Sequence, residues 1–406
     1  MPSPHRTLSR HDVAGFVASE VFAPDASGRV GIELEWVTAP TGDAAPPSLE
    51  ALRAALPDPL PGASRVTFEP GGQLELSGPA ADGLPAAIAA MTADVVAARQ
   101  ALAPLGVTLI GTGLDTGGGR DRVLDAPRYR AMEEYFDTHW PAGRTMMRHT
   151  ASIQVNVDIG SEGDVASRWA RAHALGPVLV AAFANSPFDE RGRATGWCST
   201  RFHVWDGIDP SRTGAVHRDG LDPCAAFTQY LLDARVMMIW PRGPSLDDHA
   251  VVARPHLTFG EWIDAGHDLG YPTAADLAYH LTTLFPPVRP RGWLELRMID
   301  SLPAEWWPVP VAVTAAVLDD PGVAARVDAA LEATRGEWSA AARNGLADRA
   351  LQQAAAVCFD AAHDALPRMG ANDATVAAVD EFRRRYVDRG RSPAHDRLDE
   401  RIAAPA

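Results

Sequence analysis

Four short segments of the chain alternate between hydrophobic and polar residues, which is the pattern of a β-strand with one buried face. Side chains two positions apart on a strand point to the same side. The polar positions of the four segments are Glu33 and Glu35, then Gln73, Glu75 and Ser77, then Gln154, Asn156 and Asp158, and finally Glu295 and Arg297. The pattern predicts a mostly antiparallel sheet with one apolar face and one polar face.

Helical periodicity and turn residues predict the remaining elements. The predicted helices are 9–22, 48–56, 84–103, 128–139, 162–184, 223–235, 259–266 and 274–285, and the predicted strands are 29–37, 64–69, 73–77, 107–112, 148–159 and 293–299. Residues 185–219 are dense in Gly, Pro and Asp and are predicted to be mostly loop. An alanine-rich helical region is predicted from about 303 to 389, followed by a loose polar tail over 390–406. These elements indicate an α+β fold in which helices back one sheet.

The basic residues of this chain are all arginine. Its 406 residues include 37 basic and 52 acidic side chains, for a formal net charge of −15, and none is lysine. A Walker A phosphate loop needs a lysine, as do Schiff-base catalysis and a protein-kinase site. These classes are excluded, and an ATP site would have to use arginine and metal ions.

Composition also restricts the compartment and the partners. An acidic protein repels phosphate backbones, so we expect no nucleic-acid partner. Cys198, Cys224 and Cys358 form no C-x-x-C pair, which is typical of a reducing compartment. Residues 1–10 lack the apolar run of a signal peptide, and no stretch of about 18 apolar residues occurs. We expect a cytoplasmic protein with no membrane partner, as a monomer or a weak homodimer.

The polar strand positions hold mostly carboxylates and amides, which hard divalent cations prefer as ligands. A strand face that only meets water usually mixes Thr, Lys, Arg and Ser. Glu33 and Glu35 would also repel each other without a cation between them. The alternative is a polar face that is merely solvated. Because the pattern recurs in four strands, we favour a metal-binding face.

A series of motifs in chain order resembles one enzyme family. The motifs are G-I-E-L-E at 31–35, E-P-G-G-Q-L-E-L-S-G at 69–78, R-H-T-A-S-I-Q-V-N at 148–156, F-A-N-S-P-F at 183–188, R-F-H-V-W at 201–205 with R-T-G at 212–214, and H-L-T-T-L-F-P at 280–286. Together they resemble the glutamate–cysteine ligases of plants and many bacteria. The match is best to the actinobacterial branch, whose γ-glutamylcysteine feeds ergothioneine synthesis.

The resemblance implies a single catalytic domain over 1–389 with a glutamine synthetase-like fold. It implies that ATP, as co-substrate, phosphorylates the γ-carboxylate of glutamate before the amine of cysteine displaces phosphate. It also implies two or three Mg²⁺ ions. The metal ligands that it implies are Glu33, Glu35, Glu69, Glu75, Gln154 and Glu295.

The resemblance also assigns residues to catalysis and to substrate binding. Glu35, Glu295 and Arg297 are the catalytic candidates, with Arg297 neutralising the transferred phosphoryl group. The substrate-binding candidates are Arg148, Thr150, Asn156, Arg201 and Trp205, the two arginines being suited to the α-carboxylate of glutamate. For Arg297 the alternative is a plain ion pair with Glu295, and for Trp205 it is an ordinary core position.

The sequence departs from the family pattern after Arg297, where Met298-Ile299-Asp300-Ser301 replaces Gly-Ala-Asp. The role of Asp300 is therefore open at this stage. Two other functions also remain open. One is a related carboxylate–amine ligase that joins glutamate to another amine, and the other is a non-catalytic protein that binds divalent cations.

Overall fold

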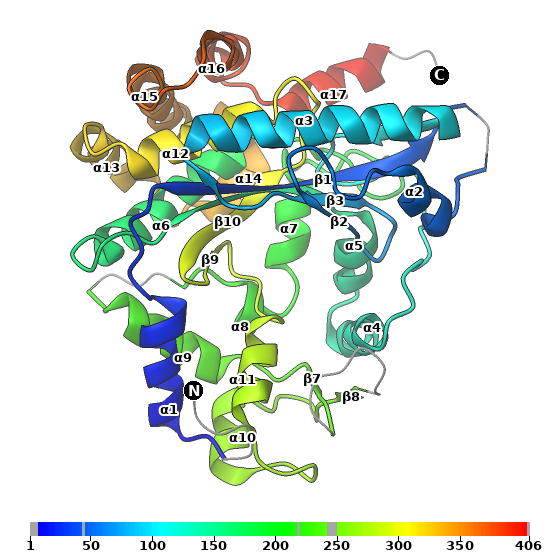
Figure 1. Ribbon diagram of the computed structural model, residues 1–406, viewed down its shortest axis with the longest axis vertical. Coiled ribbons are helices and arrows are strands. Elements are labelled where there is room, and N and C mark those ends of the chain that lie inside the picture. The colour runs from blue at the N-terminus through cyan, green and yellow to red at the C-terminus, as the bar shows by residue number, and fades with distance from the viewer. Residues whose placement is uncertain (1–6, 43–44, 217–219, 242–249, 404–406) are drawn as a thin grey trace.

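A computed structural model of the chain describes residues 7–42, 45–216, 220–241 and 250–403. Its centre is an eight-stranded sheet in which the paired strands run antiparallel (Figure 1). The strands are β1 (Arg29–Pro40), β2 (Arg65–Phe68), β3 (Leu74–Ser77), β4 (Ala81–Asp82), β5 (Val107–Ile110), β6 (Ser152–Asp158), β9 (Val288–Pro290) and β10 (Trp293–Asp300). The order is β2-β3-β1-β6-β10-β9, with β4 and β5 also pairing with the long β1. A separate hairpin joins β7 (Met238–Ile239) to β8 (Val251–Val252).

Helices cover both faces of this sheet. On one side lie α3 (Leu84–Leu102), α6 (Val165–Ala182), α12 (Pro308–Asp319), α13 (Ala324–Leu331), α14 (Trp338–Asn344), α15 (Arg349–Ala365), α16 (Asp373–Arg385) and α17 (Pro393–Ala403). The other side holds α4 (Pro127–His139), α5 (Ala142–His149), α7 (Thr200–Asp206), α8 (Pro210–Thr213), α9 (Pro223–Asp233), α10 (Phe259–Ala265) and α11 (Ala274–Leu281), as Figure 1 shows. The short α1 (Arg10–Phe16) packs against α9, and α2 (Leu49–Ala55) packs against α3.

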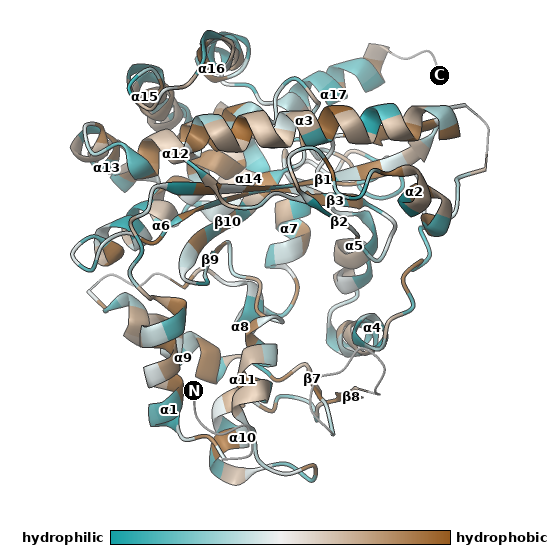
Figure 2. Ribbon diagram, in the orientation of Figure 1, coloured by the Kyte–Doolittle hydropathy of each residue, from teal (hydrophilic) through white to brown (hydrophobic). Residues whose placement is uncertain are grey.

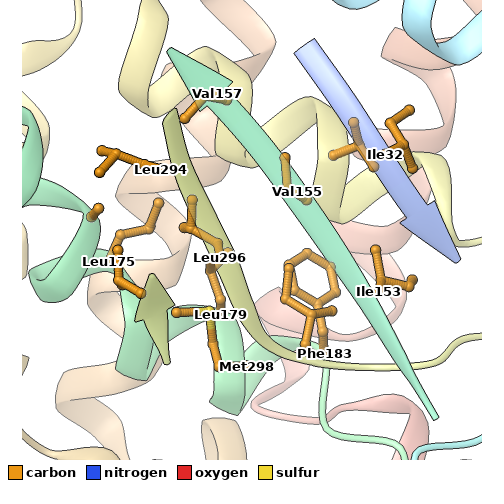
Figure 3. Close-up of a cluster of buried hydrophobic side chains, with 14 of the residues drawn as sticks. Ile32, Ile153, Val155, Val157, Leu175, Leu179, Phe183, Leu294, Leu296 and Met298 are labelled. Atoms are coloured by element: carbon orange, nitrogen blue, oxygen red, sulfur yellow. The ribbon is translucent and has the colours of Figure 1, made fainter. Parts of the chain in front are cut away.

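The apolar positions predicted from strand alternation form the core. Figure 3 shows this cluster, in which strand residues meet the side chains of α6. Its labelled members are all 2% exposed or less: Ile32, Ile153, Val155, Val157, Leu294, Leu296 and Met298 from the sheet, with Leu175, Leu179 and Phe183. Helix α12 is buried almost all round, as expected of a helix that is apolar on every side. Figure 2 shows the hydrophilic residues along the outer sides of α15 and α16.

The predicted start of one strand is wrong. The strand expected from Arg148 begins only at Ser152, because Arg148 belongs to the last turn of α5. Residues 185–219, expected to be mostly loop, are mostly loop in their described part, which also contains the short helices α7 and α8. The hydroxyl of Ser199 accepts a hydrogen bond from the backbone N–H of Phe202 (3.1 Å) and caps α7. A helix of seven residues is too short to give a clear hydrophobic period.

The expectation of a loose tail is wrong for residues 393–403, which form α17. Ala394 is fully buried, and its backbone N–H donates to the carbonyl of Ala184 (2.9 Å). The carboxylate of Asp396 accepts from the hydroxyl of Tyr386 (2.8 Å). The polar composition was misleading because hydrogen bonds and ion pairs, rather than a broad apolar face, hold this helix.

Strand β10 contains a β-bulge where it pairs with β6. The flanking pairs are Leu296 with Val155 and Ile299 with Ile153, so two residues of β10 lie opposite one residue of β6. A bulge interrupts the two-residue alternation of a strand. Asp300 consequently pairs with Ser152 and lies on the polar face with Arg297, whereas strict alternation would place it on the apolar face.

Helix α3, with the turn after it, is long and apolar enough by length and composition to cross a membrane. Core helices of ordinary globular proteins pass the same test. In this structure α3 packs on β1, and its buried residues include Leu84, Ile88, Met91, Val95 and Leu102.

Candidate active site

A cavity of about 510 Å³ lies under the polar face of the sheet. Its roof is formed by residues of the sheet, namely Glu33, Glu35, Arg65, Glu75, Ser152, Gln154, Arg289, Glu295 and Arg297, together with Glu69, Pro70 and Arg291 from turns. Its floor and walls come from the helical side, namely Arg128, Tyr129, Met132, Met146, Met147, Thr150, Arg201, Trp205, Thr282 and Phe285. All of the predicted metal ligands and catalytic residues therefore line one cavity.

Three carboxylates crowd together at one end of this face. Glu35 of β1 lies directly opposite Glu75 of β3 in the strand register, and both side chains are at most 9% exposed. Glu69 lies in the turn that joins β2 to β3, beside Glu75. Like charges directly opposite each other destabilise a sheet. Among the described residues, these three carboxylates form no salt bridge with an arginine.

The acidity of these groups reflects the same crowding. Burial raises the pKa of Glu69 well above its usual value, and the neighbouring charges of Glu75 and Glu35 raise it further. The pKa of Glu35 is raised mainly by burial and then by Glu75. Burial, followed by the charges of Glu295 and Glu75, raises the pKa of Glu33 to about 7. A group of carboxylates with raised pKa values favours a bound cation, because the cation would lower the energy of their ionised forms.

The donor set suits Mg²⁺, because that ion takes oxygen ligands from a few carboxylates and leaves positions for phosphate oxygens. Within the described ranges, however, no group of three or more His, Cys, Asp and Glu side chains is already arranged to hold a metal ion. The metal-binding role of this face therefore stays a prediction.

Glu295 has a different environment from the other glutamates. Arg289 forms a bidentate pair with it (Nε–Oε2, 2.7 Å; Nη2–Oε1, 2.9 Å), and Arg297 Nη1 donates to the same Oε1 (2.6 Å). Burial alone would raise the pKa of Glu295, but Arg289 and Arg297 outweigh burial and lower it to about 2. Glu295 is thus ionised throughout the physiological pH range and fixes both arginines.

Arg297 lies at the junction of the carboxylates and the amide. Its Nη1 also donates to Gln154 Oε1 (2.5 Å), while Gln154 Nε2 donates to Glu35 Oε1 (3.1 Å). The other Glu35 oxygen accepts from the backbone N–H of Ser152 (2.8 Å). Gln154 therefore connects the guanidinium of Arg297 to the carboxylate of Glu35 and holds both side chains in place. The ion pair between Arg297 and Glu295 exists, and Arg297 still lines the cavity.

Asp300 organises the wall behind Arg201, a role that the sequence left open. Its carboxylate accepts from the backbone N–H of Asn185 (2.8 Å), Ser186 Oγ (2.7 Å) and Ser199 Oγ (2.9 Å). Arg201 Nη1 lies 3.8 Å from Asp300 Oδ1, and Arg201 Nη2 donates to the carbonyl of Arg297. The F-A-N-S-P-F segment and the start of α7 are thus joined behind the cavity through one carboxylate.

Replacing Asp300 by asparagine should lower the free energy of unfolding by about 2 kcal/mol, because it weakens three hydrogen bonds to a buried charge and removes the negative charge beside Arg201. Urea denaturation followed by circular dichroism would measure the change. Asp364→Asn is the matched control, since Asp364 pairs with Arg326 and both are about half exposed. That variant should change stability by less than about 0.5 kcal/mol. Equal losses in both variants would contradict the role given to Asp300.

The remaining predicted substrate-binding residues divide into two groups. Thr150 and Trp205 line the cavity, Trp205 packing edge-on against Phe285 at a ring separation of 5.4 Å. Arg148 and Asn156 are not among the lining residues.

Arg148 and Asn156 have other partners. Arg148 is bonded to Glu133 of α4 and donates to the carbonyl of Arg120 (3.2 Å). Asn156 contacts Glu33 at 3.5 Å and accepts from Trp293 Nε1 (3.1 Å), at the margin of the polar face.

Several cavity residues were not assigned to the site from the sequence. Arg289 lies on the three-residue β9, too short to show alternation, and its pairing with Glu295 follows only from the strand register. Arg65, Arg128, Tyr129 and Arg291 also line the cavity. The arginines of a lysine-free chain were the available signal, but nothing in the spacing of these four arginines separated them from surface arginines.

Comparisons with known proteins identify relatives of this chain. The family model described as glutamate–cysteine ligase family 2 matches residues 29–404. The glutamate–cysteine ligase EgtA of Mycolicibacterium smegmatis is 42% identical over 416 residues, covering 98% of this chain and 93% of that protein. EgtA of Mycobacterium tuberculosis is 42% identical over 400 residues, with coverages of 96% and 90%. The chloroplastic glutamate–cysteine ligase of Nicotiana tabacum is 32% identical over 258 residues, covering 60% of this chain and 48% of that one.

Solved structures share the fold at low sequence identity. A crystal structure of glutamate–cysteine ligase from Francisella tularensis in complex with AMP has a TM-score of 0.51 and 13% identity, covering 93% of this chain and 85% of that one. A bifunctional glutathione synthetase from Pasteurella multocida has a TM-score of 0.52 and 14% identity, covering 97% and 51%. The family match and the near full-length relatives lead to one conclusion: the chain belongs to glutamate–cysteine ligase family 2.

Proposed function

We propose that this protein uses ATP to join the γ-carboxylate of L-glutamate to the amine of L-cysteine, giving γ-glutamylcysteine, ADP and phosphate. The observation that carries the proposal is the single cavity in which buried carboxylates stand beside arginines, in a chain of this family. Activation of a carboxylate by phosphorylation depends on positioned phosphates and charge neutralisation more than on a covalent side chain. The full-length similarity to EgtA enzymes supports ergothioneine synthesis as the pathway that the product enters.

In this proposal the crowded carboxylates hold Mg²⁺ together with the phosphates of ATP. The proposed ligands are Glu33, Glu35, Glu69, Glu75, Gln154 and Glu295. When bound, Mg²⁺ supplies positive charge against the transferred phosphoryl group. Glu295 is the least available of these ligands because both of its oxygens already accept from arginine. Its main contribution is to hold Arg297 and Arg289 facing the cavity.

Because the chain has no lysine, arginines supply the positive charges of the proposed site. We assign Arg297 to the transferred phosphoryl group, because Glu295 and Gln154 fix its guanidinium at the centre of the polar face. Arg201 is assigned to the α-carboxylate of glutamate, since it lines the cavity and is anchored from behind by Asp300. Trp205, beside Arg201 on α7, forms the adjoining wall. Thr150 lines the same cavity.

The proposal is tested by incubating the protein with ATP, Mg²⁺, glutamate and cysteine and following products by mass spectrometry. We expect γ-glutamylcysteine and ADP in equal amounts, with neither formed when glutamate is left out. Replacing cysteine by other amines tests the related ligase that uses another acceptor. Formation of another γ-glutamyl amide in preference to γ-glutamylcysteine would identify that alternative, and no ATP turnover would reject both.

Removal of divalent cations with EDTA should lower the ligation rate at least about 100-fold, because a bound metal contributes several kcal/mol to stabilising the transferred charge. Excess Mg²⁺ should restore the rate. If the protein binds Mg²⁺ in addition to the ion that accompanies ATP, the rate should keep rising after the Mg²⁺ concentration exceeds the ATP concentration. Initial rates over a Mg²⁺ series at fixed ATP measure this. A rate that saturates when Mg²⁺ equals ATP would contradict the additional metal sites.

A further inference from the structure

A second cavity, of about 690 Å³, lies between the end of α3, strand β5 and the C-terminal helices α16 and α17. It shares no lining residue with the active-site cavity. Its volume is in the range of pockets that bind small molecules. The proposed ligation does not use it, and none of the motifs that carry the family resemblance explains its charged lining.

Positive charge inside this cavity lacks the usual partners. Arg397 of α17 forms no hydrogen bond and no ion pair with any described residue, although burial is sufficient to lower its pKa. Arg401, one helical turn further, also has no ion pair within the described ranges. Of the lining carboxylates near them, Asp396 is already bonded to Arg385 (2.8 Å) and Tyr386 (2.8 Å), and Glu400, whose charge raises the pKa of Arg397, forms no ion pair with it among the described residues. A partly buried guanidinium without a partner favours an anion.

A second, independent feature of the wall points to a ligand. Asn185 is 1% exposed and lines the cavity, and its side-chain oxygen has no hydrogen-bond partner among the described residues. Its amide nitrogen donates to the carbonyls of Gly111 (3.0 Å) and Ser301 (2.8 Å), which fixes the orientation of the amide. Buried polar atoms are normally hydrogen bonded. The free oxygen would accept a donor from a bound molecule.

The rest of the lining is apolar or aromatic. Phe188, Trp306 and Tyr386 contribute rings, and Leu109 and Ile110 of β5 contribute aliphatic surface. A ligand that satisfies all three features has a carboxylate for Arg397, a hydrogen-bond donor for Asn185 and a small organic body. Amino acids and 2-hydroxy acids share this chemistry.

We propose that this cavity is a second ligand site that binds a small carboxylic acid carrying an amino or hydroxyl group, with Arg397 as its cationic anchor. The site is adjacent to the active-site wall, because the backbone N–H of Asn185 donates to Asp300 (2.8 Å) and Asp300 lies 3.8 Å from Arg201. The proposal does not depend on the ligase activity, since binding is measured directly.

The test is a binding screen by isothermal titration calorimetry with the standard L-amino acids, lactate and malate, without ATP. We expect at least one compound to bind the wild-type protein and to bind Arg397→Met at least about tenfold more weakly, as loss of a charge-assisted hydrogen bond implies. Arg201→Met is the matched control, because Arg201 is the residue assigned to a substrate carboxylate in the active-site cavity. The same compound should bind Arg201→Met normally. Comparing the affinities of the amino acids with those of lactate and malate shows whether the site prefers an amino or a hydroxyl donor.

Two results would overturn the proposal. One is that no compound binds, and the other is that binding is lost in Arg201→Met but kept in Arg397→Met, which would place the ligand in the active site. If Arg397→Met does not fold, a crystal of the wild-type protein soaked with the tightest compound decides the question. Ligand density at Arg397 and Asn185 would support the site, and density only under the polar sheet face would reject it.

Discussion

Replacing Glu35 by glutamine should lower kcat for γ-glutamylcysteine formation at least about 100-fold while the protein stays folded. Glu35 is buried opposite Glu75, and the cluster that they form with Glu69 is the strongest candidate for holding a cation. Glutamine has nearly the same shape and can still accept the hydrogen bond that the backbone N–H of Ser152 donates to Glu35 (2.8 Å). The substitution therefore removes charge with little change in packing. Initial rates at saturating ATP, Mg²⁺, glutamate and cysteine measure the loss.

Glu162→Gln is the control for this experiment, because Glu162 is exposed and is not among the residues that line the cavity. Its turnover should equal that of the wild-type protein. Thermal unfolding of both variants distinguishes loss of catalysis from loss of structure. Glu35→Gln with nearly normal turnover would show that the metal assignment is wrong, whatever happens in the control.

Arg297→Met should lower kcat by at least about 100-fold, the loss typical of removing one group that stabilises charge in a transition state. Its Nη1 reaches both Glu295 (2.6 Å) and Gln154 (2.5 Å), so the guanidinium is held in place before substrate arrives. Arg297→Lys keeps the charge but not the planar fork, and we expect it to recover part of the lost rate. Measuring kcat and the KM for ATP in both variants separates the two contributions.

The comparison also distinguishes a catalytic from a structural role for Arg297. If Arg297 only neutralised Glu295, the variants would lose stability while the kcat of the folded fraction stayed normal. Arg349→Met, at an exposed arginine, provides a control for a general effect of removing positive charge. An unchanged kcat in folded Arg297→Met would exclude the phosphoryl role, even if the KM for ATP rose.

The strand alternation was sufficient to predict the sheet and its two faces. Period-two positions such as Ile32, Val155 and Leu296 are buried, and Glu33, Glu35 and Glu295 line one cavity, because side-chain direction in a regular strand follows directly from sequence. Five of the six predicted metal ligands share this face for the same reason, whereas Glu69, in the turn between β2 and β3, was added to them only by the family resemblance. Strand order and register were not in the pattern, since they depend on pairings between residues far apart in the chain.

Other features could not be predicted from the sequence because they depend on tertiary contacts. Arg289 reaches Glu295 only through the pairing of β9 with β10, and Arg148 turns away from the cavity toward Glu133 of α4. Helix α17 looked like a tail because its apolar contacts are few and its hydrogen bonds run to distant segments. Such interactions leave no periodic signal in a single sequence.

The bulge in β10 has a consequence for changes in chain length. Deleting Met298 would remove the extra residue and make β10 regular, with Ile299 opposite Ile153 and Asp300 still opposite Ser152 on the face of Arg297. A regular strand of the present length would instead turn Asp300 to the apolar face, away from its serine and asparagine donors. The bulge therefore compensates for the one extra residue between Arg297 and Asp300. Homologues that differ here are best compared by the number of residues in the strand before their side chains are compared.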